Sequence, residues 1–333
     1  MRPIGVPNIL QAQRLSAATS SLRQQSETAR TELATGRIAD LPSSLGAQIG
    51  EVFSLRGAID SIEVRRQGLR QAGLIAGVAQ RSLSRSGEGA RAIASDALAA
   101  NGRRDDVALS VTASEARNRV QSVISSLNAR VAGQSIFAGE ASDRPALAGP
   151  DRLIADIAGL YAAAPDGAAL EAALDGYFNA PAGGFSAAIY SGGAGDAPSI
   201  EVDRGERLQF TLRADDGGVR DLLRGLAVIA IAGAAPASAL RDEALAAAAG
   251  DALLGVDALT ARQAEIGVAE ARAANALIAL DAEETALTEA YNGRTARDPF
   301  ETAARLQSLE SQLSSAFAVT ARLSQLNLAS FLR

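Results

Sequence analysis

Histidine, cysteine, tryptophan and lysine are all missing from this chain of 333 residues, and its 32 basic residues are all arginine. Without histidine or cysteine, the chain cannot build a zinc site of the usual type, a Ser-His-Asp or Cys-His nucleophile system, a histidine-ligated haem or an iron–sulfur cluster. We therefore expect a protein with no cofactor and no metal. The lack of cysteine leaves the compartment open, because an extracellular chain can also dispense with disulfides.

Aromatic residues are scarce as well, at 4% of the chain, although 47% of the residues are hydrophobic. The apolar content is therefore aliphatic, mainly Ala, Leu, Val and Ile. Such residues fill the seams between helices more readily than they fill one large aromatic core. This composition favours a mainly α fold.

The chain has a formal net charge of −6 and a pI near 5.0, so it has no general attraction for nucleic acid or an anionic membrane. Its first residues lack the apolar core and the small-residue cleavage site of a secretory signal peptide. The longest uncharged stretch, Gly225 to Leu240, contains Pro236 and is shorter than a membrane span. We therefore expect neither nucleic acid nor a membrane as a partner.

Three successive helices are predicted in the first part of the chain. Apolar residues seven apart indicate a helix from Ile9 to Thr35, which Gly36 ends. A second pattern predicts one very long helix from about Leu45 to Ala100, a length more typical of a coiled coil than of a globular domain. The acidic pair Asp105-Asp106 marks the start of a third helix, which runs to about Val131.

The middle of the chain, from Gly133 to about Gly218, is rich in Gly, Pro and Asp and predicts a small α+β insertion. Two short helices are expected over 153–163 and 168–178. Short strands are expected over 134–138, 185–190, 199–202 and 208–212, the last two joined by a turn at 203–206.

Helices return in the last third of the chain. We expect a helix from Val219 to Ala232, a break near Pro236, and a long helix up to Tyr291 that Asn292-Gly293 ends. The pair Asp298-Pro299 then predicts the start of the final helix, because aspartate caps a helix and proline suits its first position.

No group of side chains points to catalysis. The glycine-rich segment Ser191–Asp196 lacks the Lys-Ser/Thr of a phosphate loop, and Ala214–Gly218 lacks the carboxylate spacing of a calcium loop, so both are predicted to be turns. Adjacent carboxylates such as Glu283-Glu284 point about 100° apart on a helix and do not converge on a substrate. We therefore expect a protein that is not an enzyme.

The leucine stripes of the two terminal helices are the strongest signal in the sequence. One interpretation is that the terminal helices bury these stripes against the longer helices of the same chain. The other is that the stripes are buried only against neighbouring copies or partner proteins. We favour the second interpretation, because a chain end offers few partners of its own. The predicted assembly interface comprises Leu15, Leu22, Leu33, Leu306, Leu309, Leu313, Leu323, Leu326, Phe331 and Leu332.

Three segments resemble the bacterial flagellins and their hook-associated relatives. Leu33-Ala34-Thr35-Gly36-Arg37-Ile38 is similar to the segment that closes the N-terminal helix of that family, and Gly133-Gln134-Ser135-Ile136-Phe137-Ala138-Gly139 to the stretch after its second inner helix. The segment from Ala321 to Leu332 resembles the C-terminal signature of the members found at the hook–filament junction. The chain departs from the family at Ala39-Asp40-Leu41-Pro42, where a Ser/Ala-Asp-Asp-Pro element is common.

The resemblance covers residues 5–140 and 240–333 and implies a flagellin-like, elongated coiled-coil rod. It divides the chain into paired terminal helices (1–40 and 296–333), a helical rod domain (41–140 and 235–295) and a surface insertion (141–234). It implies a structural subunit that self-associates into a ring between hook and filament, next to a hook-associated protein on one side and flagellin or an adaptor on the other. The subunit would be exported through the flagellar type III apparatus, with the help of a chaperone, to an extracellular location.

Three other functions are considered. A filament flagellin is the nearest alternative, but the Gln-Ala-Asn element usual in its last helix is absent here. A signalling or adhesin coiled coil is more remote, because no membrane anchor is found. An enzyme that uses carboxylates of the middle insertion is the least favoured.

Overall fold

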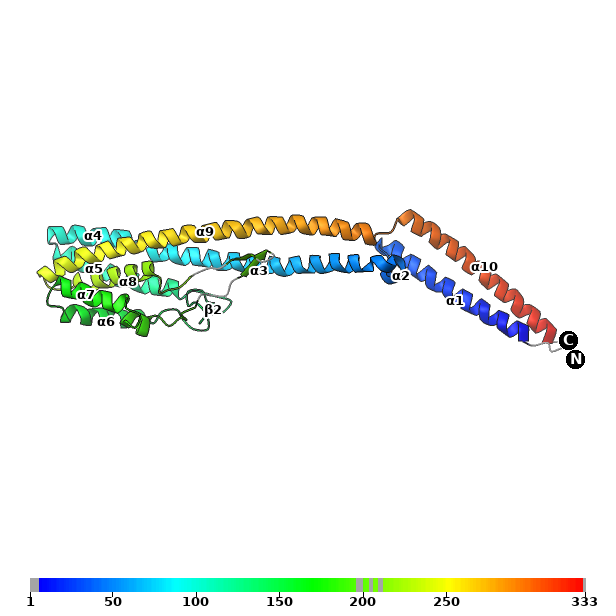
Figure 1. The fold of residues 1–333 in the computed structure, drawn as a ribbon, viewed down its shortest axis with the longest axis horizontal. Helices are drawn as coiled ribbons and strands as arrows, with labels where there is room; N and C mark the ends of the chain where they lie inside the picture. The colour runs from blue at the N-terminus through cyan, green and yellow to red at the C-terminus, as the bar shows by residue number, and fades with distance from the viewer. Residues whose placement is uncertain (1–5, 196–199, 204–205, 209–211, 332–333) are drawn as a thin grey trace. The chain divides into compact units, whose positions relative to one another are not determined.

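The computed structural model describes residues 6–195, 200–203, 206–208 and 212–331, with side chains over 10, 13–195 and 212–322. The fold is mainly α, as the composition predicted, and its strands are very short (Figure 1). It divides into two compact units, one formed by Met1–Glu63 and Asp281–Arg333 and the other by Val64–Leu280.

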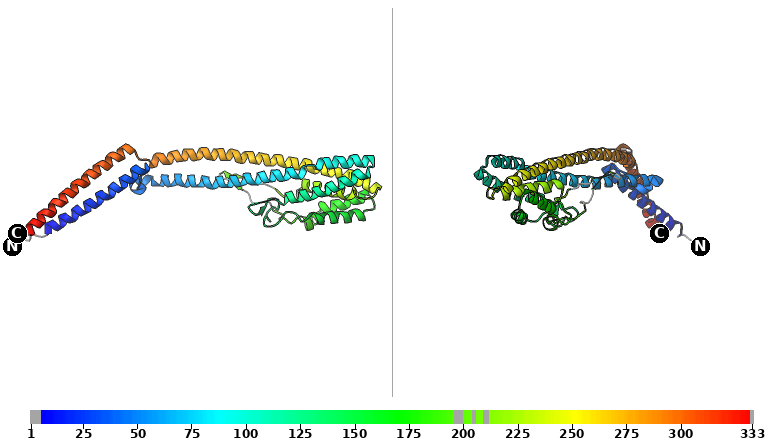
Figure 2. Two further views of the ribbon diagram at one scale, coloured as in Figure 1. Left: turned by 180° about the vertical axis from the view of Figure 1, so that it is seen from behind. Right: turned by 60° about the vertical axis from the view of Figure 1, so that its left-hand side comes forward.

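The first unit contains the first and last helices, α1 (Val6–Thr35) and α10 (Pro299–Phe331), which lie side by side and run antiparallel (Figures 1 and 2). Gly36, with φ at +65°, ends α1 as predicted. Asp298 caps α10, because its carboxylate accepts the backbone N–H groups of Phe300 at 2.7 Å and Glu301 at 3.3 Å. The predicted start of the last helix is therefore confirmed.

The loops at the closed end of this helix pair are tied together by backbone hydrogen bonds. The Ile38 N–H donates to the Thr295 carbonyl at 2.8 Å, and the Arg297 N–H donates to the Gly36 carbonyl at 3.0 Å. The helix before α10, α9 (Ala239–Thr295), runs through Asn292-Gly293, so the predicted stop there is wrong. The helix ends three residues after Asn292, where the loop that follows α1 provides a partner for the Thr295 carbonyl.

The predicted helix from Leu45 to Ala100 is broken into shorter pieces. It comprises α2 (Leu41–Leu45), a 3₁₀ turn η1 (Gly46–Gln48), α3 (Ile49–Gly87) and α4 (Ala90–Arg103). The break between α3 and α4 falls at Gly89, which has φ at +71°. Residues with a Cβ rarely adopt this left-handed backbone conformation, so glycine suits the turn between the two helices. The next helix is α5 (Asp106–Leu127). The cap of α5 by Asp105 is confirmed, since its carboxylate accepts the Ala108 N–H at 3.0 Å.

The core of the second unit is built around α8 (Gly217–Ala232), which is buried on nearly all sides. It packs against α4, α5, α6 (Pro150–Ala163) and α7 (Gly167–Phe178). It also approaches α9 so closely that a Cβ on Gly225 would lie 2.4 Å from the Ala248 carbonyl oxygen. The sequence assigned α8 to the surface insertion, whereas the structure places it in this core.

Two strand pairs lie in the middle segment. β1 (Arg130–Val131) pairs with β2 (Gln134–Ser135), and β3 (Ile200–Asp203) pairs with β4 (Glu206–Leu208). The hairpin predicted from the strands 199–202 and 208–212 is therefore found, although β4 begins at residue 206, inside the expected turn. In the strand predicted over 134–138, only the first two residues are extended, and they form β2. The strand predicted over 208–212 cannot be compared in full, because its residues 209–211 lie outside the described residues.

The strand predicted over 185–190 is wrong, because Phe185–Ile189 forms a turn of π-helix. Phe185 and Ile189 are both buried there, and the Phe185 ring lies 5.5 Å from the ring of Phe178. A helical turn places two residues four apart on one side, which is what the packing against Phe178 requires.

Among the described residues, one helix, α9, is long and apolar enough to cross a membrane, judged by length and composition alone. Its most apolar window has a mean hydropathy of 1.4, and 44% of that window is buried inside the protein. A core helix of a soluble protein passes the same test, and α9 packs closely on α8 around Gly225 and Ala252. The absence of a membrane partner, which was argued from the stretch at Gly225–Leu240, stays a prediction.

Candidate assembly surface

The surface predicted from the leucine stripes lies on α1 and α10, which form the paired terminal helices. Side chains at every third or fourth position of α10 are buried or half-buried, as a seam between two helices requires. On α10 these are Thr302, Leu306, Leu309, Leu313 and Ala316, and on α1 they are Leu15, Thr19, Leu22, Ser26, Ala29 and Glu32.

The predicted interface residues occupy several different positions. Leu309 is buried in the seam, with 5% of its surface exposed, and Leu15, Leu22, Leu306 and Leu313 are half-buried there. Leu33 is exposed. The side chains of Leu323, Leu326 and Phe331 lie outside the described ones, although their backbone belongs to α10, and Leu332 lies outside the described residues altogether.

Glu32 takes the seam position next to Leu33, which the leucine pattern did not predict. Its carboxylate accepts the Ala39 N–H at 3.2 Å and lies 3.6 Å from Nε of Arg297, while only 4% of its side chain is exposed. The buried charge thus has both a hydrogen-bond donor and an opposite charge beside it, as a buried carboxylate requires. The sequence signal was weak, because both partners are supplied by loops rather than by the helix itself.

Polar contacts also cross the two helices outside the seam. Arg30 forms an ion pair with Glu310 at 2.9 Å, and the guanidinium of Arg23 lies 5.8 Å from the centre of the Phe317 ring. These contacts fix the register of the pair. They contribute little stability, because exposed ion pairs are worth about 0–1 kcal/mol.

The terminal helix pair leaves large apolar side chains in contact with solvent. Leu10, Phe317 and Val319 are each about half exposed, and Phe300 at the start of α10 is 86% exposed. A two-helix pair has only one internal seam, so it cannot bury a second apolar face within one chain. The arrangement can therefore accept further helices.

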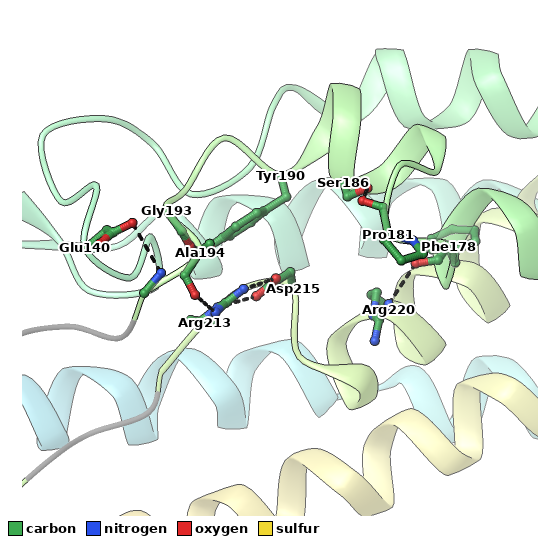
Figure 3. Close-up of polar contacts among 11 residues, drawn as sticks. Glu140, Phe178, Pro181, Ser186, Tyr190, Gly193, Ala194, Arg213, Asp215 and Arg220 are labelled. Atoms are coloured by element: carbon green, nitrogen blue, oxygen red, sulfur yellow. Dashed lines mark hydrogen bonds and ion pairs between the residues drawn. The ribbon is translucent and has the colours of Figure 1, made fainter.

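The glycine-rich loop Ser191–Asp196 is the other segment that the sequence singled out, and its described residues, up to Gly195, serve packing (Figure 3). The Tyr190 hydroxyl donates to the Gly193 carbonyl at 2.9 Å, and the Gly195 N–H donates to Glu140 at 3.3 Å. A Cβ on Gly192 or Gly193 would lie 2.3 Å from the Tyr190 hydroxyl or from Cγ of Glu140. The glycines are therefore required by close approach to these side chains rather than by a ligand.

The side chain of Arg213 connects this loop to the segment that precedes α8. Its guanidinium pairs with Asp215, donates to the Ala194 carbonyl and lies 5.7 Å from the centre of the Tyr190 ring (Figure 3). The hydrogen bonds that Arg213 donates to Asp215 are the main cause that raises the pKa of Arg213 above its ordinary value, and burial raises the pKa of Tyr190. Each polar group of the cluster thus already has a partner inside the protein.

Carboxylates of the second predicted turn are also used structurally. Asp216 accepts the Gly218 N–H at 3.1 Å at the start of α8 and pairs with Arg262 at 2.7 Å. In the part of the chain that the structure describes, no group of three or more Asp or Glu side chains could hold a metal ion.

A buried ionic cluster joins α7, α8 and α9. Arg224 of α8, whose side chain is 10% exposed, pairs with Glu171 and with Asp251 at 2.9 Å. Burial raises the pKa of Asp251 to about 6, against the smaller opposing effect of Arg224. Burial also raises the pKa of the neighbouring Asp221. The cluster therefore couples the packing of three helices to pH.

No family model matches the sequence, and no curated protein is significantly similar to it.

Proposed function

We propose that this chain is a structural subunit of the bacterial flagellum, which forms the junction between hook and filament by polymerising through its terminal helices. The proposal combines the three sequence segments that resemble the flagellin and hook-associated family with one structural observation. That observation is the antiparallel pairing of α1 and α10 around a seam that leaves half of their described large apolar side chains exposed.

The pairing matters because it brings two helices that are almost 300 residues apart in sequence into one assembly element. Neighbouring copies can bury Leu10, Phe317 and Val319, which the single chain leaves in water, at a gain of about 25 cal/mol for each Å² of apolar surface removed from solvent. Under the proposal, these helices form a coiled-coil inner tube, and the part of residues 141–234 that precedes α8 contributes an α+β surface insertion. A ring of copies then contacts a hook-associated protein on one side and flagellin or an adaptor on the other.

The proposal also includes the route and the place of the protein. It implies export through the flagellar type III apparatus with a dedicated chaperone, and an extracellular location at the tip of the hook. It assigns the chain no catalytic activity, and it needs no cofactor, nucleic acid or membrane. Filament flagellin is the nearest alternative, and the number of copies in each flagellum separates the two.

A charge in the seam tests the proposal. Leu309→Asp places a carboxylate at a position that is 5% exposed, whereas Ser308→Asp adds the same charge to an exposed neighbouring position. In cells that lack the native gene, we expect the Ser308→Asp variant to restore filaments and the Leu309→Asp variant to yield hooks without filaments. Immunogold labelling of the native chain should mark one narrow band between hook and filament.

Several outcomes would contradict the proposal. Label spread along the whole filament would identify the chain as a flagellin instead. Normal filaments in cells that lack the gene altogether would exclude both flagellar functions.

A further inference from the structure

Four exposed aliphatic side chains form two pairs on the helices α3 and α9 of the second unit. Val64 and Leu74 of α3 are 71% and 55% exposed, and Ile278 and Val268 of α9 are 68% and 54% exposed. In each helix the two residues are ten positions apart, which is about 15 Å along the axis.

Both pairs point away from the seam that the two helices share. The buried side chains of α9 include Ile266 and Leu280, each two positions from an exposed residue of the pair and so about 200° around the helix. The same relation holds on α3, where Ile62 and Ala72 are buried. The two pairs therefore lie on the two outer edges of the α3–α9 segment, one on each edge.

The two edges are also matched in level along the helices. The side-chain amide of Gln80 donates to the Gln263 carbonyl at 2.6 Å, which fixes the antiparallel register of α3 and α9. Counted from that contact, Leu74 lies opposite residue 269 and Val64 opposite residue 279. Each is thus within one residue of the level of an exposed partner, Val268 or Ile278.

We propose that these edges are the two halves of one contact between copies of this chain, in which α9 of one copy packs against α3 of the next. This inference rests on the proposed function, in which copies associate side by side. A second copy is the occupant that the geometry favours, because one sideways step without any axial shift places Ile278 against Val64 and Val268 against Leu74 of the neighbour. The contact then repeats the antiparallel direction that α3 and α9 already have within the chain.

The residues that flank Val268 and Ile278 on the outer face of α9 suit such a contact. Small side chains on the outer face of α9 let a second helix approach closely, and they follow the alternating three- and four-residue spacing of a helix–helix seam. They are Ala261, Ala264, Ala271 and Ala282, all of them exposed. Because the edges differ from one another, the contact is head-to-tail, and a small rotation at each step closes it into a ring.

Paired cysteines test the contact, since the chain has no cysteine of its own. The matched variants are Val64→Cys with Ile278→Cys, and Leu74→Cys with Val268→Cys. Within one chain the two edges cannot be bridged: helix axes lie about 8–10 Å apart and each Cα lies about 2.3 Å further out, beyond the roughly 7 Å limit of a disulfide. A disulfide between these positions therefore reports a neighbouring copy.

The experiment uses the purified full-length chain at concentrations where sedimentation velocity shows oligomers, with mild oxidation and non-reducing electrophoresis. We expect each matched variant to give a ladder of covalent oligomers. The mismatched variant, Val64→Cys with Val268→Cys, is displaced by about 15 Å and should lose the ladder. The single-cysteine variants should remain monomeric on the gel.

Each other outcome has a definite meaning. Oligomers without a ladder in the matched variants overturn the edge contact and leave the proposed polymerisation through the terminal helices standing. Dimers from Val64→Cys alone overturn it too, because they require like edges to meet. A chain that stays monomeric at every concentration overturns both the contact and the proposed function.

Discussion

Replacing Gly225 with alanine places a methyl group where the helices α8 and α9 touch. The added Cβ would lie 2.4 Å from the Ala248 carbonyl oxygen and 2.5 Å from the Ala252 nitrogen, whereas ordinary contacts of a Cβ are 3.4–4 Å. Both obstructing atoms belong to the backbone of α9, so neither can rotate away. The two helices must therefore move apart by about 1 Å, which loosens the contacts on either side.

The two effects of this substitution have opposite signs. Alanine stabilises a helix interior by about 0.5–1 kcal/mol relative to glycine, because it loses less conformational entropy on folding. Overpacking of a well-filled core costs about 1–3 kcal/mol. Because rigid backbone faces the new methyl group, we expect the larger part of that cost to apply, so that Gly225→Ala lowers the free energy of unfolding by about 1–2 kcal/mol.

Gly250→Ala is the matched control, because Gly250 lies in the interior of α9 and a Cβ there would meet nothing within 4 Å. We expect this variant to be more stable by about 0.5–1 kcal/mol. Urea unfolding followed by tyrosine fluorescence measures both, since Tyr161, Tyr177 and Tyr190 all lie in the second unit. If Gly225→Ala were stabilised as much as Gly250→Ala, the close contact between α8 and α9 would be refuted.

Three further predictions concern pH, helix capping and proteolysis. The raised pKa of Asp251, about 6, means that the folded state holds its proton more tightly than the unfolded state, so stability should fall as the pH rises from about 4 to 6. The urea concentration at half-unfolding, measured across this pH range, should change less with pH in Asp251→Asn than in the native chain. Asp96→Asn, at an exposed position of α4, should leave the pH dependence unchanged. Asp298→Ala should destabilise the first unit by about 1 kcal/mol, measured by thermal melting, and Asp298→Asn should retain most of the cap. Limited trypsin digestion should remove both terminal helices first and leave a core from about Arg37 to Arg297, because a single seam protects them; equal protection of the ends would argue for a self-contained bundle.

The candidate assembly surface on α1 and α10 could be predicted only in part from the sequence. Residue spacing placed Leu309 and its neighbours correctly on one face of α10, since that face depends on the helical period alone. It could not show that Glu32 rather than Leu33 occupies the seam, because the partners of Glu32 are Ala39 and Arg297, in the two loops at the closed end of the helix pair. Nor could it show that exposed residues of α3 and α9 stand at matching levels, which depends on the register set by Gln80.

The sequence by itself determined the features whose causes lie within a few residues. Gly36 ends α1 through its own positive φ, and Asp105 and Asp298 cap their helices through the N–H groups two or three positions away. The tertiary structure decided the features whose causes lie far along the chain. The helical turn at Phe185 depends on Phe178, and the close approach of α8 to α9 depends on Gly225 facing the backbone of Ala248 and Ala252. Local hydrogen bonds are encoded by neighbours in sequence, whereas the position of a side chain that blocks or fills a space is known only once distant helices have packed.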